Sequence, residues 1–309
     1  MALLFYSKVD DSRGWGDALR ALDPDIDFRV WPDAGDPAEI DAALVWKPEA
    51  GLLERFPNLK LIQSLGAGVD HIVGVPGLPR NVPIARLVDP TLTQQMVEYV
   101  LLAVLLHQRQ WQAYAAQQRE RRWHHLPAWE AERCHVGVMG LGEIGGAAAR
   151  ALVDRGYAVS GWTRSPREIE GVRTFHGMDG LPAFLAELDV LVCLLPLTED
   201  TRGIIDKKAL AALPRGAYLV NAARGGHVVD EDLLSALGTG QVSGACLDVF
   251  NEEPLPPDHP YWTHAQVMVT PHVAGLTLPH GSMPQVIENL RRVRAGQLPL
   301  NRVDLDRGY

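Results

Sequence analysis

Short apolar runs alternate with polar segments that are able to form helices along most of the chain. The first such runs are LLFYS, DFRVW, AALVW and LKLIQSLG, at residues 3–7, 27–31, 42–46 and 59–66. This alternation is typical of a small parallel sheet with helices packed on it. The unit ends near Arg86, and a long helical segment is predicted from about Thr93 to Arg122. A proline in the segment that follows, residues 124–134, ends the helical pattern.

A second alternation begins after this helix, and its apolar runs are nearly continuous. The six runs are HVGVMG, AVSGW, DVLVCLLP, AYLVNAA, GACLDV and VMVTPH, at residues 135–140, 158–162, 189–196, 217–223, 244–249 and 267–272. Continuous apolar runs are expected of strands that are covered on both faces. Helical segments lie between them, such as GAAARALVDRG, KKALAAL and DEDLLSALGTG. Strands joined by helical crossovers predict a doubly wound parallel sheet, which binds ligands beyond the carboxyl ends of its strands.

The last segment, from about Gly281 to Tyr309, contains a helix, PQVIENLRRVRAG, but no strand that could extend the second sheet. We therefore expect it to return to the first domain. The predicted fold class is α/β, with two Rossmann-like or flavodoxin-like domains built on doubly wound parallel sheets. Residues 1–98 and 281–309 are predicted to form one domain, and residues 99–280 a second domain inserted within it.

Composition narrows the classes of partner. The chain has 309 residues, 47% of them hydrophobic and 22% charged, which is an ordinary mixture for a globular protein of two domains. Its formal net charge of −9 argues against a nucleic-acid partner, whose phosphates require a basic face. An anionic ligand must therefore be held by local arginines. Only residues 109–125 are locally basic, and the simplest interpretation is a solvated helix face.

The cysteines and the N-terminus indicate a cytoplasmic protein. Cys134, Cys193 and Cys246 are too few and too scattered for a disulfide framework, and we interpret them as buried thiols in a reducing compartment. The first residues show neither a basic region nor a small-residue cleavage site. The longest apolar run, VEYVLLAVLL, is shorter than the roughly 20 residues that a membrane span needs.

The first motif with a chemical use is a glycine-rich turn. Gly140, Gly142 and Gly145 have the G-x-G-x-x-G spacing directly after an apolar strand and directly before a helix. In a dinucleotide-binding unit the first glycine makes the tight turn, the second lets the pyrophosphate approach, and the third lets helix and strand pack closely. The helix N-terminus then offers N–H groups to the phosphates. We predict a dinucleotide cofactor at this turn.

The end of the next strand indicates which dinucleotide is bound. NAD-binding units place an acidic residue there, which accepts hydrogen bonds from the ribose hydroxyls. Here Thr163, Arg164 and Ser165 occupy the place, with Arg167 beyond them. A carboxylate would repel a 2′-phosphate, whereas hydroxyls and a guanidinium can bind it. We therefore expect NADP (NADPH) as cofactor, with NAD as a weaker substitute; the alternative is that Arg164 lies on an ordinary exposed turn.

Three polar residues follow later strands of the second unit: Arg224, Glu253 and His272. Reduction of a 2-oxo acid requires a group that clamps the carboxylate and polarises the ketone, for which arginine is suited, and a proton donor, for which histidine is suited. A carboxylate beside the histidine would orient its ring. Singly, these residues could be a turn residue, a solvated charge and a helix cap. Their joint placement after strands that follow a dinucleotide motif favours the catalytic interpretation.

At this point the chain resembles the D-isomer-specific 2-hydroxyacid dehydrogenase family over nearly its whole length. The motifs that carry the resemblance are SLGAGVDHI, GLGEIG, VCLLPLTEDTRGIID, LVNAARGGHVVDEDLLSAL, ACLDVFNEEPLP and TPHVAG. The family has a substrate domain assembled from both chain ends and a cofactor domain inserted between them. By this resemblance Arg224 holds the substrate carboxylate and carbonyl, His272 is the acid/base, and Glu253 is its partner. Glu253 is chosen over Glu252 because the family's glutamate directly precedes the proline.

The resemblance also implies binding residues. Glu143 and Ile144 of the glycine motif belong to the cofactor site, Asp248 binds the nicotinamide carboxamide, and Leu195 and Pro196 pack near the nicotinamide. The backbone amides of Ala67 and Gly68 are a further anchor for the substrate carboxylate, although this loop could be a plain glycine turn.

Finer features resemble the glyoxylate/hydroxypyruvate reductase A group, which uses NADPH on small 2-oxo acids. These features are Trp46 in LVWKP, the WTRS turn, the short C-terminal segment and the terminal DRGY. Trp46 is accordingly a candidate substrate-binding residue, or else an ordinary core aromatic. The family also suggests a homodimer joined through the long helix and residues 109–125.

Three other interpretations are open. The substrate could be a larger aryl or branched 2-oxo acid, since every 2-oxo acid presents the same groups to Arg224. The protein could instead be a dinucleotide-sensing binding protein, because corepressors share this fold; the presence of all three catalytic candidates argues against this. A metal enzyme is disfavoured, because His124 and His125 are adjacent and no pair of histidines has a convincing ligand spacing.

Overall fold

The computed structural model describes all residues, 1–309, and they divide into two compact units. One unit comprises Met1–Leu92 and Thr277–Tyr309, and the other comprises Thr93–Leu276. The second is inserted within the first and both contain parallel sheets, so the predicted fold class is confirmed. The first boundary lies six residues before the expected one, because helix α3, Pro90–Gln108, belongs to the inserted unit from its first turn onward. The second boundary lies four residues before the expected one.

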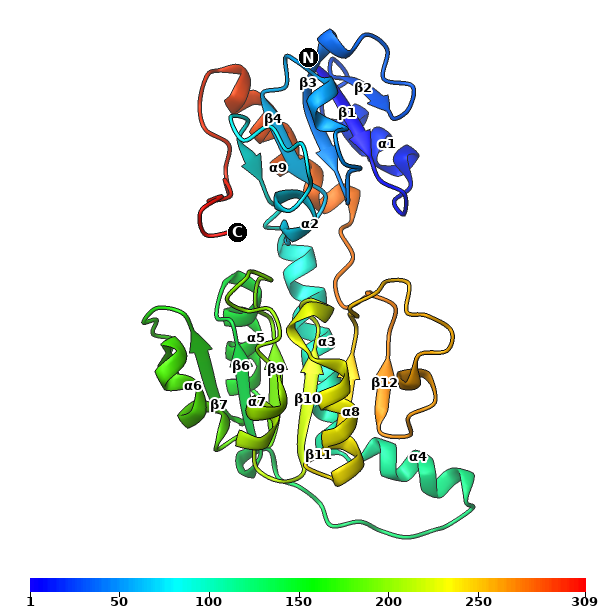
Figure 1. The fold of residues 1–309 in the computed structure, drawn as a ribbon, viewed down its shortest axis with the longest axis vertical. Helices are drawn as coiled ribbons and strands as arrows, with labels where there is room; N and C mark the ends of the chain where they lie inside the picture. The colour runs from blue at the N-terminus through cyan, green and yellow to red at the C-terminus, as the bar shows by residue number, and fades with distance from the viewer. The chain divides into compact units, whose positions relative to one another are not determined.

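The first unit contains a five-stranded parallel sheet with the order β2-β1-β3-β4-β5 (Figure 1). Its strands are β1 (Ala2–Tyr6), β2 (Asp27–Val30), β3 (Ile40–Val45), β4 (Leu61–Ser64) and β5 (Ile84–Ala85). Its helices are α1 (Ser12–Leu22), α2 (Asp70–Val73) and α9 (Pro279–Arg294), with short 3-10 turns at Pro37–Glu39 and Leu53–Arg55. The C-terminal segment closes this unit, since α9 packs beside α1 and the amide of Val303 donates to the Ile84 carbonyl at 2.8 Å.

The inserted unit contains a seven-stranded parallel sheet with the order β12-β11-β10-β9-β6-β7-β8 (Figure 1). Its strands are β6 (His135–Met139), β7 (Ala158–Thr163), β8 (Val172–His176), β9 (Val190–Cys193), β10 (Ala217–Asn221), β11 (Val242–Leu247) and β12 (Val267–Val269). Besides α3 its helices are α4 (Trp111–Arg119), α5 (Glu143–Val153), α6 (Gly177–Leu185), α7 (Lys207–Ala212) and α8 (Asp230–Thr239). Three 3-10 turns, η3 (Ala131–Arg133), η4 (Gly225–His227) and η5 (Pro260–Trp262), complete it.

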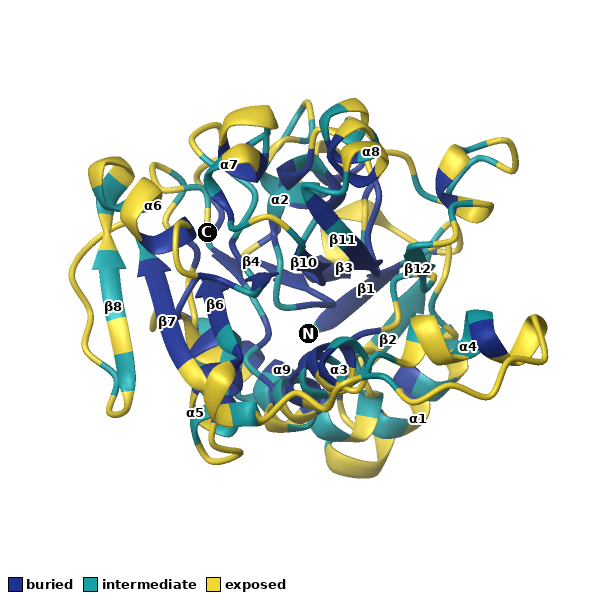
Figure 2. Cartoon of the chain, turned by 90° about the horizontal axis from the view of Figure 1, so that it is seen from below, coloured by how far each residue is buried: buried dark blue, intermediate teal, exposed yellow.

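The structure differs from the sequence-based expectation in three elements. Strand β8 was not predicted, because it is an edge strand whose residues stay partly or fully exposed (Figure 2) and therefore lacks a continuous apolar run. Strand β5 was missed because it has only two residues. The single long helix is in fact α3 and α4, which are separated where Gln110 adopts a left-handed backbone with φ of +55°.

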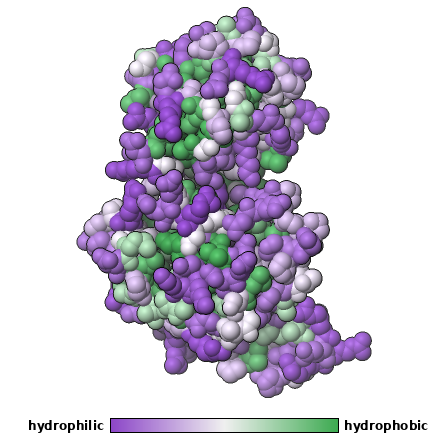
Figure 3. Space-filling view, in the orientation of Figure 1, coloured by the Kyte–Doolittle hydropathy of each residue, from purple (hydrophilic) through white to green (hydrophobic).

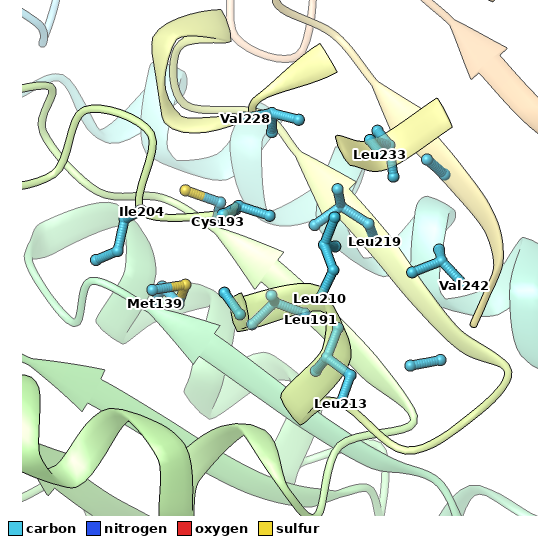
Figure 4. Close-up of a cluster of buried hydrophobic side chains, with 14 of the residues drawn as sticks. Met139, Leu191, Cys193, Ile204, Leu210, Leu213, Leu219, Val228, Leu233 and Val242 are labelled. Carbon is cyan, nitrogen blue, oxygen red and sulfur yellow. The ribbon is translucent and has the colours of Figure 1, made fainter. Parts of the chain in front are cut away.

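Both sheets are covered with apolar side chains on each face. In the inserted unit one face packs Met139, Leu191, Cys193 and Leu219 of the strands against Leu210 of α7 and Leu233 of α8 (Figure 4). The other face packs against α3 and α5. On the molecular face drawn in Figure 3, hydrophilic residues prevail and hydrophobic ones form only small groups. No helix combines the length and apolar character that a membrane crossing would need.

Candidate active site

The predicted site residues of the inserted unit gather at one edge of its sheet. Because all seven strands are parallel, their carboxyl ends share that edge (Figure 1). The residues that follow or end successive strands there are Gly140 after β6, Thr163 at the end of β7, Leu195 after β9, Arg224 after β10, Asp248 after β11 and His272 after β12. The strand order switches between β6 and β9: β7 and β8 are added on one side of β6, and β9 to β12 are added on the other. Open α/β sheets bind their ligands at such a switch point.

The glycine turn after β6 has the geometry that a pyrophosphate requires. Gly140 has φ of +90°, and a Cβ there would lie 2.8 Å from the Leu194 carbonyl oxygen. A Cβ on Gly145 would overlap the Gly140 carbonyl, so α5 lies directly on the turn. Gly142 is the N-cap of α5 without a side-chain cap, and a Cβ there would meet nothing within 4 Å. Helix α5 therefore begins without a side-chain cap for its first-turn amides, which include those of Glu143 and Ile144, and the turn fits a dinucleotide phosphate.

The turn at the end of β7 is exposed and carries no acidic residue at the ribose position. The Thr163 hydroxyl donates to the Ser165 carbonyl at 2.6 Å, so its proton is used within the turn and its oxygen remains an acceptor. Arg164, Ser165 and Arg167 are all exposed. Among these groups, Arg164 and Arg167 supply the positive charge that a 2′-phosphate would need.

Residues 194–196, after β9, line the other side of the glycine turn. Leu195 is buried, whereas Pro196 is half-buried and its carbonyl accepts the Thr201 hydroxyl at 2.7 Å. Leu194 and Leu195 approach Gly140 closely, so the segment after β9 lies directly against the glycine turn.

His272 and Glu253 form a hydrogen-bonded pair. Nδ1 of His272 lies 3.0 Å from Oε2 of Glu253, and both side chains are partly buried. The other oxygen of Glu253 accepts the amide of Phe250 at 3.2 Å, which orients the carboxylate. Because a carboxylate only accepts, Nδ1 carries a hydrogen in this pair, and Nε2 is left as the nitrogen that can exchange a proton with a ligand.

Hydrogen bonds at the backbone carbonyl and at the guanidinium hold Arg224 in place. Its carbonyl accepts from Nδ2 of Asn221 at 2.9 Å and lies 3.0 Å from Nδ1 of His227, while its guanidinium donates to the Ala223 carbonyl at 2.7 Å. A Cβ on the next residue, Gly225, would overlap the backbone of Phe250. The loop that carries Arg224 therefore touches the loop that leads to Glu253.

His227 is fully buried, and both of its ring nitrogens face carbonyl oxygens. Nε2 lies 3.3 Å from the carbonyl of Pro196, and Nδ1 faces that of Arg224. Burial opposes the charged ring, yet the Cys193 sulfur and the two carbonyls together raise its pKa above the usual value. His227 ties the loop after β9 to the loop after β10.

Asp248 is buried, and its carboxylate is used by the protein itself. Oδ1 accepts from the Thr270 hydroxyl at 2.7 Å and from the Val273 amide at 2.8 Å, and Oδ2 accepts from the Ala274 amide at 2.9 Å. In this structure Asp248 anchors the loop that carries His272. The contact with the nicotinamide that the resemblance implies stays a prediction.

The remaining candidates lie in the first unit. Trp46 follows β3, and its ring packs on that of His71 with centroids 4.0 Å apart. It also covers Gly66, where a Cβ would lie 2.8 Å from the indole. The loop with Ala67 and Gly68 follows the neighbouring strand β4 and is tied by Ser64, whose hydroxyl donates to the Gly68 carbonyl at 3.1 Å. Trp46 and this loop therefore lie at the same edge of the five-stranded sheet.

A family model for the NAD-binding domain of D-isomer specific 2-hydroxyacid dehydrogenases matches residues 101–274, which is more than half of the chain. The chain belongs to this family. The dehydrogenase is 40% identical to a glyoxylate/hydroxypyruvate reductase A of Yersinia enterocolitica, over 100% of both chains.

Solved structures are similar over the full length as well. A D-isomer specific 2-hydroxyacid dehydrogenase of Xanthobacter autotrophicus, in complex with NADPH and MES, is 47% identical with a TM-score of 0.96, covering 100% of this chain and 99% of that one. An NADPH-dependent glyoxylate/hydroxypyruvate reductase of Sinorhizobium meliloti, in complex with NADP and sulfate, is 41% identical with a TM-score of 0.94 and the same coverage.

Sequence reasoning did not find Asn221 and His227. Asn221 ends the apolar run AYLVN, and a polar residue at the end of a fully buried strand is a signal that could have been used. His227 gives no such signal, because its burial depends on two loops that meet only in the fold.

Proposed function

We propose that this dehydrogenase reduces small 2-oxo acids, glyoxylate and hydroxypyruvate, to 2-hydroxy acids with NADPH, and that His272 donates the proton. The observation that carries the proposal is the His272–Glu253 pair at 3.0 Å, beside the loop of Arg224 and at the same sheet edge as a glycine turn that fits a dinucleotide. The NADPH-dependent relatives of the same length, and the absence of an acidic residue at Thr163 and Arg164, support the choice of cofactor.

The residues of this chain divide the binding tasks. The amides of Glu143 and Ile144 hold the pyrophosphate, Arg164 and Arg167 hold the 2′-phosphate, and Leu195 and Pro196 flank the nicotinamide. When bound, NADPH supplies the hydride.

The substrate is held through its carboxylate and ketone. The guanidinium of Arg224 binds the carboxylate and polarises the ketone oxygen, because its donors form a planar fork. In the first unit, the amides of Ala67 and Gly68 make no hydrogen bond within the chain, so they remain candidates for binding a carboxylate. Trp46, whose ring packs on His71 at the same sheet edge, is the candidate side chain of this unit for contact with the substrate.

His272 moves the proton. Its Nδ1–H is fixed on Glu253, so Nε2 faces the ketone oxygen and protonates it as the alcohol forms. Glu253 stabilises the positive charge of the ring before the transfer and selects the tautomer after it.

The test is the initial rate of NADPH and of NADH oxidation with glyoxylate, hydroxypyruvate and phenylpyruvate. We expect fast turnover with NADPH on one of the two small acids and much slower turnover with NADH. Comparable efficiency with both cofactors would contradict the cofactor assignment, and preference for phenylpyruvate would show that the substrate is a larger aryl 2-oxo acid.

We also propose a homodimer joined through α4 and its flanks. Large apolar side chains are exposed there and include Leu102, Leu105, Trp111, Tyr114, Trp123 and Trp129. A groove of about 270 Å³ opens between Tyr114 and the segment 126–129. Such a concentration of exposed apolar surface is typical of a contact with another chain, here a second copy. Light scattering that shows a monomer at micromolar concentration would refute the dimer.

We place the enzyme in the cytoplasm. Cys134, Cys193 and Cys246 are buried free thiols, as expected for a protein of a reducing compartment.

The proposed substrate of the enzyme, a 2-oxo acid, is a small anion.

A further inference from the structure

Tyr99, on α3, directs its hydroxyl at the segment that follows β12. The phenol oxygen lies 2.6 Å from the Thr270 hydroxyl and 3.3 Å from the sulfur of Cys246. The Thr270 hydroxyl in turn lies 2.7 Å from the Asp248 carboxylate. Since a carboxylate only accepts, Thr270 donates to Asp248, and its oxygen accepts the proton of Tyr99. The directions of these two hydrogen bonds are thereby fixed.

Asp248 transmits this order to the backbone around His272. Its side chain accepts the amides of Val273 and Ala274 at 2.8 Å and 2.9 Å, and its carbonyl accepts the amide of His272 at 2.8 Å. His272 has φ of +56°, a left-handed conformation that is unfavourable for a residue with a side chain and persists only where the surroundings hold it.

A second contact joins α3 to the same segment. Gln95 lies one helical turn before Tyr99, so both side chains are on one face of the helix. Its amide group donates to the carbonyl of Leu276 at 3.0 Å and accepts the amide of Leu276 at 3.2 Å. Helix α3 therefore holds the segment 270–276 at both ends.

We propose that Tyr99 is a positioning residue for His272: its hydroxyl orders Thr270 and Asp248, and these hold the strained backbone that aims the His272 ring. The proposal rests on the proposed catalytic role of His272. Tyr99 itself touches neither substrate nor cofactor, and its effect reaches the site through Thr270 and Asp248. Proton transfer itself is left to His272 and Glu253.

The protonation state of the Tyr99 hydroxyl supports its role as the donor to Thr270. Burial raises the pKa of Tyr99 well above its usual value, and the neighbouring Cys246 adds to the shift. The hydroxyl therefore keeps its proton over the whole working range of the enzyme, and Tyr99 remains the donor to Thr270.

The experiment compares Tyr99→Phe with a matched control, Tyr157→Phe. Tyr157 is buried, whereas Tyr99 is partly buried, and the Tyr157 hydroxyl donates at 2.7 Å to Gln108 at the other end of α3. Each substitution keeps the ring and removes a hydroxyl that bonds to or from the same helix, and Tyr99→Phe also removes the contact with Cys246. Only the first is connected to the loop of His272.

We expect Tyr99→Phe to lower kcat about tenfold, the size expected for loss of one ordering hydrogen bond, with the KM for NADPH unchanged. Tyr157→Phe should leave both constants near the wild-type values. Thr270→Val should lower kcat by a similar factor, and the double variant Tyr99→Phe, Thr270→Val should be little worse than either single one, because both changes break one chain of hydrogen bonds.

A second readout needs no turnover. In the free enzyme, hydrogen exchange at the amides of Val273 and Ala274 should be faster in Tyr99→Phe than in wild type and unchanged in Tyr157→Phe. Equal exchange and equal kcat in the two tyrosine variants would overturn the proposal. A wild-type enzyme that reduces no 2-oxo acid would overturn the proposed function instead, and the exchange rates would then show whether Tyr99 still orders the loop.

Discussion

Two segments at the same sheet edge are built in opposite ways. The segment after β12, residues 270–276, is tied by Asp248 through three side-chain hydrogen bonds and by α3 through Tyr99 and Gln95. In the turn after β7, residues 163–168, Thr163 donates to Ser165, and residues 164–168 are exposed.

The difference follows from the two tasks. Proton transfer depends on distance and angle, and a displacement of about 1 Å can cost a large part of the rate, so His272 needs a rigid support. Recognition of a phosphate by an arginine depends mainly on charge and tolerates movement of the side chain, so Arg164 can lie on an exposed turn. Changes in the first segment should therefore affect kcat, and changes in the second should affect cofactor binding alone.

The largest effect is expected for His272→Ala. Loss of the proton donor should lower kcat by roughly 10² to 10⁴, the range typical of a general acid. NADPH binding, followed by the change in its fluorescence, should stay nearly intact because the cofactor turns after β6 and β7 are untouched. Near-normal turnover would mean that another residue is the acid and that the rigid segment serves some other purpose.

Helix α3, which supports the segment 270–276, should also make the stability of the protein sensitive to acid. His107, on α3, stacks on Tyr218 with ring centroids 4.4 Å apart, and burial lowers its pKa to about 4. The unfolded chain binds this proton near pH 6.5, so the free energy of unfolding is highest above that pH and falls as the pH is lowered to about 4. The loss attributable to His107 is on the order of 3 kcal/mol, because burial holds its pKa well below that of a histidine in the unfolded chain.

Urea titrations between pH 7 and pH 4 measure this loss. His107→Phe keeps an aromatic ring against Tyr218 and cannot titrate, so its stability should depend less on pH. His125→Gln, a change at an exposed histidine, is the control and should retain the wild-type slope. Equal slopes in all three proteins would exclude His107 as the source of the acid sensitivity.

Glu253→Gln tests the support that the His272 ring receives at Nδ1, as distinct from the support of its backbone by Asp248. An amide at this place can still accept from Nδ1, but it no longer stabilises the positive ring, so kcat should fall about 10- to 100-fold while the KM for NADPH changes little. The free energy of unfolding should change by less than about 1 kcal/mol, because the pair is only partly buried. A change in KM with unaltered kcat would show that Glu253 acts in binding.

The smallest effect on catalysis is expected for Arg164→Ala. The KM for NADPH should rise about tenfold, and kcat and the KM for NADH should change little, because NADH lacks the 2′-phosphate that Arg164 is proposed to bind. Arg173→Ala is the matched control, because Arg173 is an exposed arginine on the neighbouring strand β8. Its guanidinium pairs with the carboxylate of Glu187 at 2.7 Å. If both variants retain the wild-type KM for NADPH, Arg164 is an ordinary surface residue.

The alternation of apolar runs and helical segments predicted both domains, and the motifs predicted the residues at the strand ends. Strands such as β6, β9 and β10 are fully or nearly fully buried, so their apolar runs were long enough to identify. The edge strand β8 and the break at Gln110 were not identified. An edge strand has one face in solvent, and a left-handed residue that is neither glycine nor asparagine has no local signature.

The sequence by itself determined the chemistry available at each strand end: the glycine turn after β6, the uncharged Thr163 after β7, and the arginine, glutamate and histidine that follow β10, β11 and β12. These features are local, since they depend on residue type and on spacing of a few residues. Only the tertiary structure decided how they are held. Tyr99 and Thr270 are 171 residues apart, and Asp248 lies 22 residues before the hydroxyl that it accepts. A polar side chain bonds to whatever the fold brings within about 3 Å, and sequence separation carries no information about that distance.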